Sequence, residues 1–333
     1  MNERAFTMAR RVASAAGLLA SVAVAQEPAR RGPPAPAFDV AQAFESGSSG
    51  PESVTTDADG NLYLSLGQRL MRRTIEGDVE LFSTLPLPIF ALGVKVGPDG
   101  CLYNASASLS EAPGAFVWRT CEPHASEVLA ELDQTGLPND LAFDTAGNLF
   151  VTDPGLGRVW QVSADGGVSV LVEHPSLAGD PAAPALLFRS LGANGIAFDA
   201  CERFLYVSNT DQGSVLRIDP LAASPVPELV VQAPQLRGAD GIAFDRDGTL
   251  FVTVNASDAL VAVSPHGQPE VLGLGGLLDA PSSLVFGATR ADRHRLYLTS
   301  SAFSRTLGLQ PGTPQPALLV APVRTPGAPL PLR

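Results

Sequence analysis

Four side chains with metal-binding oxygen atoms recur at one position of a segment that is repeated six times along the chain. That position is occupied in turn by Glu52, Leu92, Asn139, Asn194, Asp240 and Ser282. If the repeats close into a ring, these residues meet at its axis. Two of them are carboxylates and two are amides, and with no Lys or Arg partner among the four the carboxylates repel each other unless a cation lies between them.

The types of these four residues indicate which cation to expect. Ca²⁺ takes six to eight oxygen ligands in flexible geometry, with waters in the open positions, and another divalent metal remains possible. Zinc would normally require His or Cys ligands. The alternative interpretation is that Asn, Asp and Glu are ordinary residues at turns and strand starts. Because all four share one phase of the repeat, we favour the metal site, with Glu52, Asn139, Asn194 and Asp240 as its ligands.

The repeated segment itself predicts the fold. Each copy is a short apolar strand, a turn of the Asp-Gly type and a second apolar strand, as in ADGIAFDRDGTLFVTV from Ala239. Successive copies are separated by 40 to 55 residues, which is typical of β-propeller blades. An open β-sandwich also has many short strands, but it does not explain six copies in phase. We therefore predict an all-β chain, a six-bladed β-propeller of four-stranded blades over residues 37–324.

Closure of the propeller requires strands from both ends of the chain. The segment Phe38–Phe44 precedes the first copy, and Pro316–Pro322 is the last strand-like run. We expect the N-terminal strand to complete the sheet formed by the C-terminal strands, which would remove free sheet edges.

The N-terminus has the pattern of a secretory signal peptide. Arg4, Arg10 and Arg11 precede an apolar run and an Ala-Val-Ala sequence that ends at Ala25. We predict a signal peptide over residues 1–25, a flexible linker over 26–36 and a Pro-rich tail over 325–333, although an uncleaved anchor is the alternative. The mature protein would be periplasmic or secreted.

Charge and cysteine content limit the partners and chemistry further. The formal net charge of −12 argues against nucleic acid or an anionic membrane as a partner after signal cleavage. Cys101 and Cys121 flank a predicted hairpin, so they form either a disulfide or two buried thiols, and both interpretations remain open. Cys201 lies in a turn and has no evident partner.

Several of the repeated segments resemble a known family. The sequences GPESV, PND, ANGIAFD, ADGIAFD and PSSLVFG resemble those of the senescence marker protein (regucalcin)/gluconolactonase family. The resemblance covers nearly all of residues 45–305 and implies a six-bladed propeller with one divalent metal at the axis and, in many members, lactone hydrolysis. It maps the family's ligands to Glu52, Asn139, Asn194 and Asp240. Sugar lactonases of the family tend to carry an Arg where this chain has Leu137, which favours a less polar substrate here.

The expected function is therefore an exported, Ca²⁺-dependent lactonase or esterase that acts as a monomer on a small molecule. Asp240 is the predicted general base. Second strands return to the same mouth of the propeller, so Asp153, Asn209 and Asn104 are predicted to bind substrate. The alternatives are a non-catalytic binding propeller and a phosphotriesterase-type hydrolase on the same scaffold.

Overall fold

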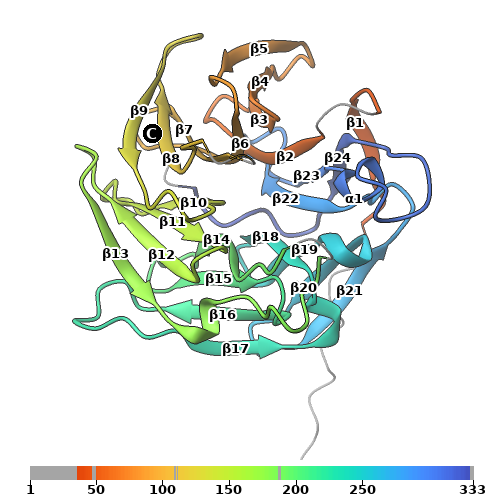
Figure 1. Ribbon diagram of the computed structural model, residues 1–333. Helices are drawn as coiled ribbons and strands as arrows, with labels where there is room; N and C mark the ends of the chain where they lie inside the picture. Colours follow the sequence, from red (N-terminus) through yellow and green to blue (C-terminus); the bar gives the residue numbers. More distant parts are fainter. Residues whose placement is uncertain (1–35, 47–49, 109, 111, 187–188, 331–333) are drawn as a thin grey trace, which may run out of the picture. The chain divides into compact units, whose positions relative to one another are not determined.

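The chain folds into six four-stranded antiparallel sheets, arranged around a common centre as the blades of a β-propeller (Figure 1). The computed structural model describes residues 36–46, 50–108, 110, 112–186 and 189–330. The predicted signal peptide, nearly all of the linker and the last three residues of the tail lie outside these ranges. Within them, no helix is long and apolar enough to cross a membrane.

Each of the first five blades is formed by four consecutive strands, the first of which is innermost. Blade one comprises β2 (Pro51–Thr56), β3 (Leu62–Leu66), β4 (Arg69–Arg73) and β5 (Val79–Thr84); blade two comprises β6 (Ile89–Val96), β7 (Leu102–Ser108), β8 (Phe116–Thr120) and β9 (Ser126–Glu131). Blade three comprises β10 (Leu141–Phe143), β11 (Leu149–Asp153), β12 (Arg158–Val162) and β13 (Val168–Glu173). Blade four comprises β14 (Ala193–Phe198), β15 (Leu205–Asn209), β16 (Ser214–Ile218) and β17 (Glu228–Gln232); blade five comprises β18 (Ala239–Phe244), β19 (Leu250–Val254), β20 (Ala259–Val263) and β21 (Pro269–Leu274).

Blade six joins the two ends of the propeller. Its strands are β22 (Pro281–Phe286), β23 (Arg295–Ser300), β24 (Ala317–Pro322) and, outermost, β1 (Asp39–Ala43). β1 pairs antiparallel with β24, with Asp39 opposite Val320 and Ala43 opposite Ala317. The predicted closure is thus confirmed, and each end of the ring holds the other in place.

Short helical turns occur only in the connections of the described chain. They are the 3-10 turns η1 (Pro175–Leu177), η2 (Pro234–Leu236) and η3 (Asn255–Ser257), and the single-turn helix α1 (Phe303–Thr306). The tight turns between first and second strands rely on glycine. Gly147 and Gly248 adopt φ values of +89° and +82°, a region in which a side chain would be strained.

Aromatic pairs fix the angle between successive blades. An aromatic ring on the second strand of one blade meets a ring on the first strand of the next, edge to face, with centroids 4.8–5.5 Å apart. The pairs are Tyr103–Phe143, Phe150–Phe198, Tyr206–Phe244 and Phe251–Phe286. Edge-to-face pairs contribute about 1 kcal/mol each beyond their buried area. This packing holds the inner strands, and so the axial side chains, in a fixed relation.

The two cysteines whose pairing the sequence left open form a disulfide. Cys101 precedes β7 and Cys121 follows β8, so the bond closes the end of this hairpin. Cys201 is exposed and free.

Candidate metal centre

A small cavity lies where the inner strands begin, and three of the four predicted metal ligands line it. Glu52 is the second residue of β2, Asp240 the second residue of β18, and Asn139 lies just before β10. The full lining is Glu52, Ser53, Gly93, Asn139, Asp140, Asp240, Gly241, Ser282 and Ser283. The cavity volume is about 10 Å³, which is room for a single water-sized guest. We call this cavity the axial pocket.

Asn194, the fourth predicted ligand, does not line the axial pocket. It is 2% exposed at the start of β14, and its Nδ2 donates to Thr210 Oγ1 at 3.0 Å. Its Oδ1 is buried and has no hydrogen-bond partner. A buried amide oxygen without a partner is costly, and a cation nearby would satisfy it.

The ionised forms of the two predicted carboxylate ligands, Glu52 and Asp240, are disfavoured by their surroundings. Burial, the charge of Glu52 and the charge of Asp140 raise the pKa of Asp240 well above its usual value, although a 2.7 Å hydrogen bond from Asn255 Nδ2 opposes the shift. Burial and the charge of Asp140 raise the pKa of Glu52 to about 7. These groups therefore lack enough positive partners, which is the condition that a bound cation relieves.

Sequence reasoning missed two charged residues at this site. Asp140 also lines the axial pocket, and its Oδ1 lies 3.9 Å from the ammonium nitrogen of Lys95. Lys95 thus pairs with Asp140 and not with any of the four predicted ligands. A signal was present in the repeats, because the residue after the axial position is small in every copy except the third. It reads Ser53, Gly93, Asp140, Gly195, Gly241 and Ser283.

A ring of hydroxyl groups fixes the backbone of the axial residues. In five blades, a Ser or Thr of the second strand donates to the carbonyl of the axial residue in the next blade. The pairs are Ser65 to Leu92 at 2.6 Å, Thr152 to Asn194, Ser208 to Asp240 at 2.7 Å, Thr253 to Ser282 at 3.0 Å, and Thr299 to Glu52 at 3.2 Å.

Blade two is the exception in this ring. The corresponding residue is Ala105, and the amide of Gly93 donates instead to the Asn139 carbonyl at 2.7 Å. Every axial backbone carbonyl is thus bound by the preceding blade. This arrangement gives the axial side chains a rigid base on which to converge.

The residues predicted to bind substrate do not line the axial pocket. Asp153 is 0% exposed, and its carboxylate accepts hydrogen bonds from the amides of Leu137, Gly155 and Leu156 and from Trp160 Nε1. These bonds hold the turn after β11 and compete with the burial that raises the pKa of Asp153.

Asn209 and Asn104 are also 0% exposed. Asn209 donates to the carbonyls of Ser176 and Ala178, and Asn104 donates to the carbonyl of Ala105 at 3.3 Å. These contacts serve the fold, and a part for Asp153, Asn209 and Asn104 in substrate binding stays a prediction.

Strand alternation explains why other residues reach the axial ligands instead. Asn209 pairs with Ala193, so these two side chains share a face and Asn194 lies on the opposite one. The next residue, Thr210, therefore contacts Asn194. In blade five, Asn255 likewise lies one place beyond the end of β19 and contacts Asp240. A prediction that is wrong by one residue at the end of a second strand therefore names a side chain on the face that does not contact the axial ligand.

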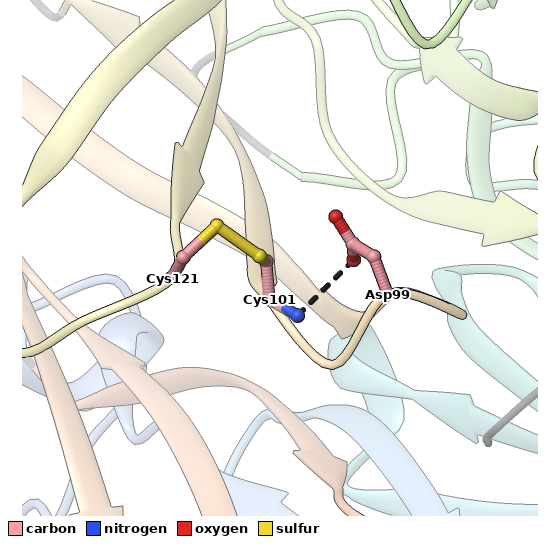
Figure 2. A group of neighbouring side chains, drawn as sticks. All are labelled: Asp99, Cys101 and Cys121. Carbon is pink, nitrogen blue, oxygen red and sulfur yellow. Dashed lines mark hydrogen bonds between the residues drawn. A yellow bond between two sulfur atoms is a disulfide. The ribbon is translucent and has the colours of Figure 1, made fainter.

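A second cluster of potential ligands is not a metal site. Asp99, Cys101 and Cys121 place a carboxylate oxygen and two sulfur atoms within 4.8 Å of one another (Figure 2). The two sulfur atoms are bonded to each other, so neither is the thiolate that a metal requires. The carboxylate of Asp99 is also bound by the amide of Cys101 and by Arg119.

The types of the axial residues fit a hard divalent cation. Carboxylate and amide oxygens are the ligands that Ca²⁺ prefers, and the pocket has room for one ion. The raised pKa values of Glu52 and Asp240 indicate that a positive partner belongs in the pocket. The unpartnered Oδ1 of Asn194 does not line the pocket, but a cation nearby would satisfy it.

Comparison with known proteins agrees with this architecture. The family described as "SMP-30/Gluconolactonase/LRE-like region" matches residues 51–302. The lactonase drp35 of Staphylococcus haemolyticus is 24% identical over 230 residues, which is 66% of this chain and 67% of the relative.

Two solved structures share the propeller fold. The calcium-binding protein regucalcin from Agrobacterium tumefaciens has a TM-score of 0.62 at 18% identity, covering 89% of this chain and 97% of that one. A gluconolactonase from Xanthomonas campestris has a TM-score of 0.60 at 19% identity, covering 87% and 90%. At these identities the likeness concerns the fold alone.

Proposed function

The chain belongs to the SMP-30/gluconolactonase/LRE-like family, and on that basis we propose that it is a Ca²⁺-dependent hydrolase of lactones or related carboxylic esters that acts outside the cytoplasm. The observation that carries the proposal is the convergence of Glu52, Asn139 and Asp240 in one small pocket, with both carboxylates raised in pKa.

Four residues would hold the ion. Glu52 and Asp240 would supply negative charge, and Asn139 and Asn194 would supply amide oxygens, with waters completing the coordination. When bound, the ion supplies a Lewis acid that polarises the ester carbonyl oxygen and stabilises the oxyanion that develops on it. Glu52 acts in this scheme as a ligand only.

Asp240 is the residue that would move a proton. Its Oδ2 accepts from Asn255 Nδ2 at 2.7 Å, and its backbone carbonyl accepts from Ser208 Oγ at 2.7 Å, so both ends of the residue are held in place. A carboxylate in this buried position is a stronger base than one in water, because burial disfavours its charged form. Asp240 would accept a proton from the water that attacks the ester carbonyl carbon, as general base.

The substrate is proposed to be less polar than a sugar lactone. Leu137 lies two residues before Asn139, and its aliphatic side chain can form no hydrogen bond with a sugar hydroxyl. Part of the connection that follows β13 is hydrogen-bonded to blade four. The carboxylate of Asp211 accepts from the amides of Asp180, Ala185 and Leu191 at 2.7–2.9 Å. This connection is rich in Ala, Pro and Leu, which supports selection of an apolar substituent on a small molecule.

Two features support the proposed location. The pattern of the first 25 residues is that of an export signal. The bond between Cys101 and Cys121 is of the kind that persists in oxidising compartments.

The test is a substrate panel measured with and without a chelator. The panel contains alkyl-substituted lactones, a sugar lactone, an aryl ester and a phosphotriester. We expect lactone or ester hydrolysis that falls at least about 100-fold on chelation and returns with added Ca²⁺, with alkyl lactones preferred over the sugar lactone.

Two results would contradict the proposal in different ways. Turnover of the phosphotriester alone would favour the phosphotriesterase alternative. Protein that binds Ca²⁺ but turns over no member of the panel would favour the binding-propeller alternative.

A further inference from the structure

The chain contains a single lysine, and it lies beside the axial pocket. Of its 22 basic residues, 21 are Arg and one is Lys95. Lys95 is on β6, three places after the axial residue Leu92, and its side chain is 22% exposed. Its ammonium nitrogen lies 3.9 Å from Asp140 Oδ1.

Asp140, the partner of Lys95, is held firmly. Its Oδ1 accepts from the amide of Leu141 at 2.8 Å, and its Oδ2 accepts from the amide of Ile196 at 3.2 Å. Lys95, Asp140 and Ile196 belong to blades two, three and four, so the ion pair is anchored across three blades. The two backbone amides keep the carboxylate of Asp140, and so the partner charge of Lys95, beside the pocket.

The ionisable groups at and beside the pocket have a net charge of −2 when all are ionised. Glu52, Asp140 and Asp240 contribute three negative charges when ionised, and Lys95 contributes one positive charge, which leaves −2. The pocket has room for one water-sized guest. One divalent cation would therefore neutralise the cluster, whereas without Lys95 the remaining charge of −3 would suit a trivalent ion.

We infer that Lys95 is a positioning residue that sets the charge of the axial pocket to match one divalent cation and so disfavours cations of higher charge. The inference rests on the proposed cation site and deepens it. Lys95 acts through Asp140, because Asp140 lines the pocket and Lys95 does not.

Lysine suits this role better than arginine. An ammonium group is a compact point charge, whereas a guanidinium binds a carboxylate through two parallel hydrogen bonds. The separation of 3.9 Å is longer than a hydrogen bond, so Lys95 contributes charge and leaves the oxygens of Asp140 to the backbone amides.

The experiment measures Ca²⁺ and Tb³⁺ binding to the full chain by calorimetry and terbium luminescence, after chelation and dialysis. Removing one positive charge should strengthen binding of both ions. Since Coulomb energy is proportional to the ion's charge, we expect Lys95→Met to tighten Ca²⁺ binding about tenfold and Tb³⁺ binding about thirtyfold. The preference for Tb³⁺ over Ca²⁺ would then rise about threefold.

Further variants separate charge from shape. Lys95→Arg keeps the charge and should keep the wild-type ratio of affinities. Asp140→Asn should shift the ratio about threefold toward Ca²⁺. The double variant Lys95→Met/Asp140→Asn restores the net charge of −2 around the pocket and should restore the wild-type ratio of Tb³⁺ and Ca²⁺ affinities. Because it removes both charges of the ion pair, it also serves as the test if the single variant Lys95→Met folds poorly. Arg119→Met is the matched control, because Arg119 pairs with Asp99 outside the axial pocket.

Four outcomes would overturn the inference. An unchanged ratio in Lys95→Met, or equal shifts in Lys95→Met and Lys95→Arg, would leave Lys95 with a steric role while the proposed cation site stands. A double variant that keeps the ratio of Lys95→Met would show that Asp140 does not transmit the charge. Wild-type protein that binds neither ion would overturn the cation site and this inference together.

Discussion

Acidic residues at two places in this molecule have pKa values that are shifted in opposite directions, and the first of them, Asp99, is exposed whereas the axial carboxylates are buried. Near the disulfide, at the end of the blade-two hairpin opposite its turn, Asp99 accepts hydrogen bonds from Arg119 at 2.7 Å and from the Tyr103 hydroxyl at 2.8 Å. Burial alone would raise the pKa of Asp99, but these bonds and that of the Cys101 amide outweigh it and lower the pKa. At the axial pocket, burial and neighbouring carboxylates raise the pKa of Asp240.

The difference separates a group that stabilises the fold from one that is prepared for a ligand. Asp99 has its own guanidinium beside it, whereas among the described residues the only ion pair made by Glu52, Asp140 or Asp240 is that of Asp140 with Lys95. Carboxylates with too few partners destabilise the protein until a cation arrives.

The largest difference between the two places is expected in turnover, when the variant Asp240→Asn is compared with the variant Asp99→Asn. Asp240→Asn should lower kcat about 10³-fold, because it removes the general base and a ligand. In the presence of chelator, its melting temperature should rise, since a repelling carboxylate is gone. Asp99→Asn should keep its turnover and lose about 1 kcal/mol of stability with its charged hydrogen bonds.

Kinetics and thermal melts of both variants check this prediction. Full activity in Asp240→Asn would exclude its role as base. A lower melting temperature for that variant under chelation would show that its charge is already compensated without an ion.

In metal-free protein, the raised pKa of Glu52 should make the stability of the fold decrease as the pH rises. Its pKa of about 7 in the folded state is higher than the usual 4.5, so the folded protein retains a proton that the unfolded chain has lost. The contribution of this proton to the free energy of unfolding is complete below about pH 4.5 and disappears as the pH rises through 7. The loss amounts to about 3 kcal/mol for Glu52 alone.

Denaturant unfolding between pH 5 and 8, with chelator and with saturating Ca²⁺, measures this effect. Ca²⁺ binds the ionised site and should remove the decline. Glu52→Gln should reduce the decline without Ca²⁺. A metal-free protein whose stability increased across this range would contradict the account of the axial pocket.

The smallest effect on the axial pocket is expected from the disulfide, although it matters for the fold. Replacing Cys101 and Cys121 by Ser opens a loop with a sequence separation of 20 and should cost about 3 kcal/mol of stability. Ca²⁺ affinity should stay within about twofold of wild type, because neither cysteine lines the pocket. Calorimetry and denaturant unfolding of the double variant provide the test, and a large loss of affinity would mean that the two regions are coupled.

The repeat made the fold and part of the site predictable. Six copies in phase, with turns such as the one at Gly147, specified six blades, and the segment Phe38–Phe44 indicated the closure that β1 provides. Glu52, Asn139 and Asp240 were found because the repeat places them at one phase. Asp140 and Lys95 were missed because the search considered one position of the repeat and not its neighbours.

Residues outside the repeat phase could not be assigned in this way. Asn209 and Asn255 look alike in sequence at the ends of second strands, yet only Asn255 contacts an axial ligand. A shift of one residue reverses the face of a strand, and the sequence does not specify where strand pairing ends.

The amino-acid sequence alone determined the number of blades and the convergence of acidic and amide side chains, because a periodic pattern of apolar strands permits few closed arrangements. Only the tertiary structure decided how the charges balance. Lys95 and Asp140 lie 45 residues apart in the chain and come within ion-pair distance through the packing of two blades. Charge balance depends on distances in space, and these are set by how neighbouring blades pack against each other.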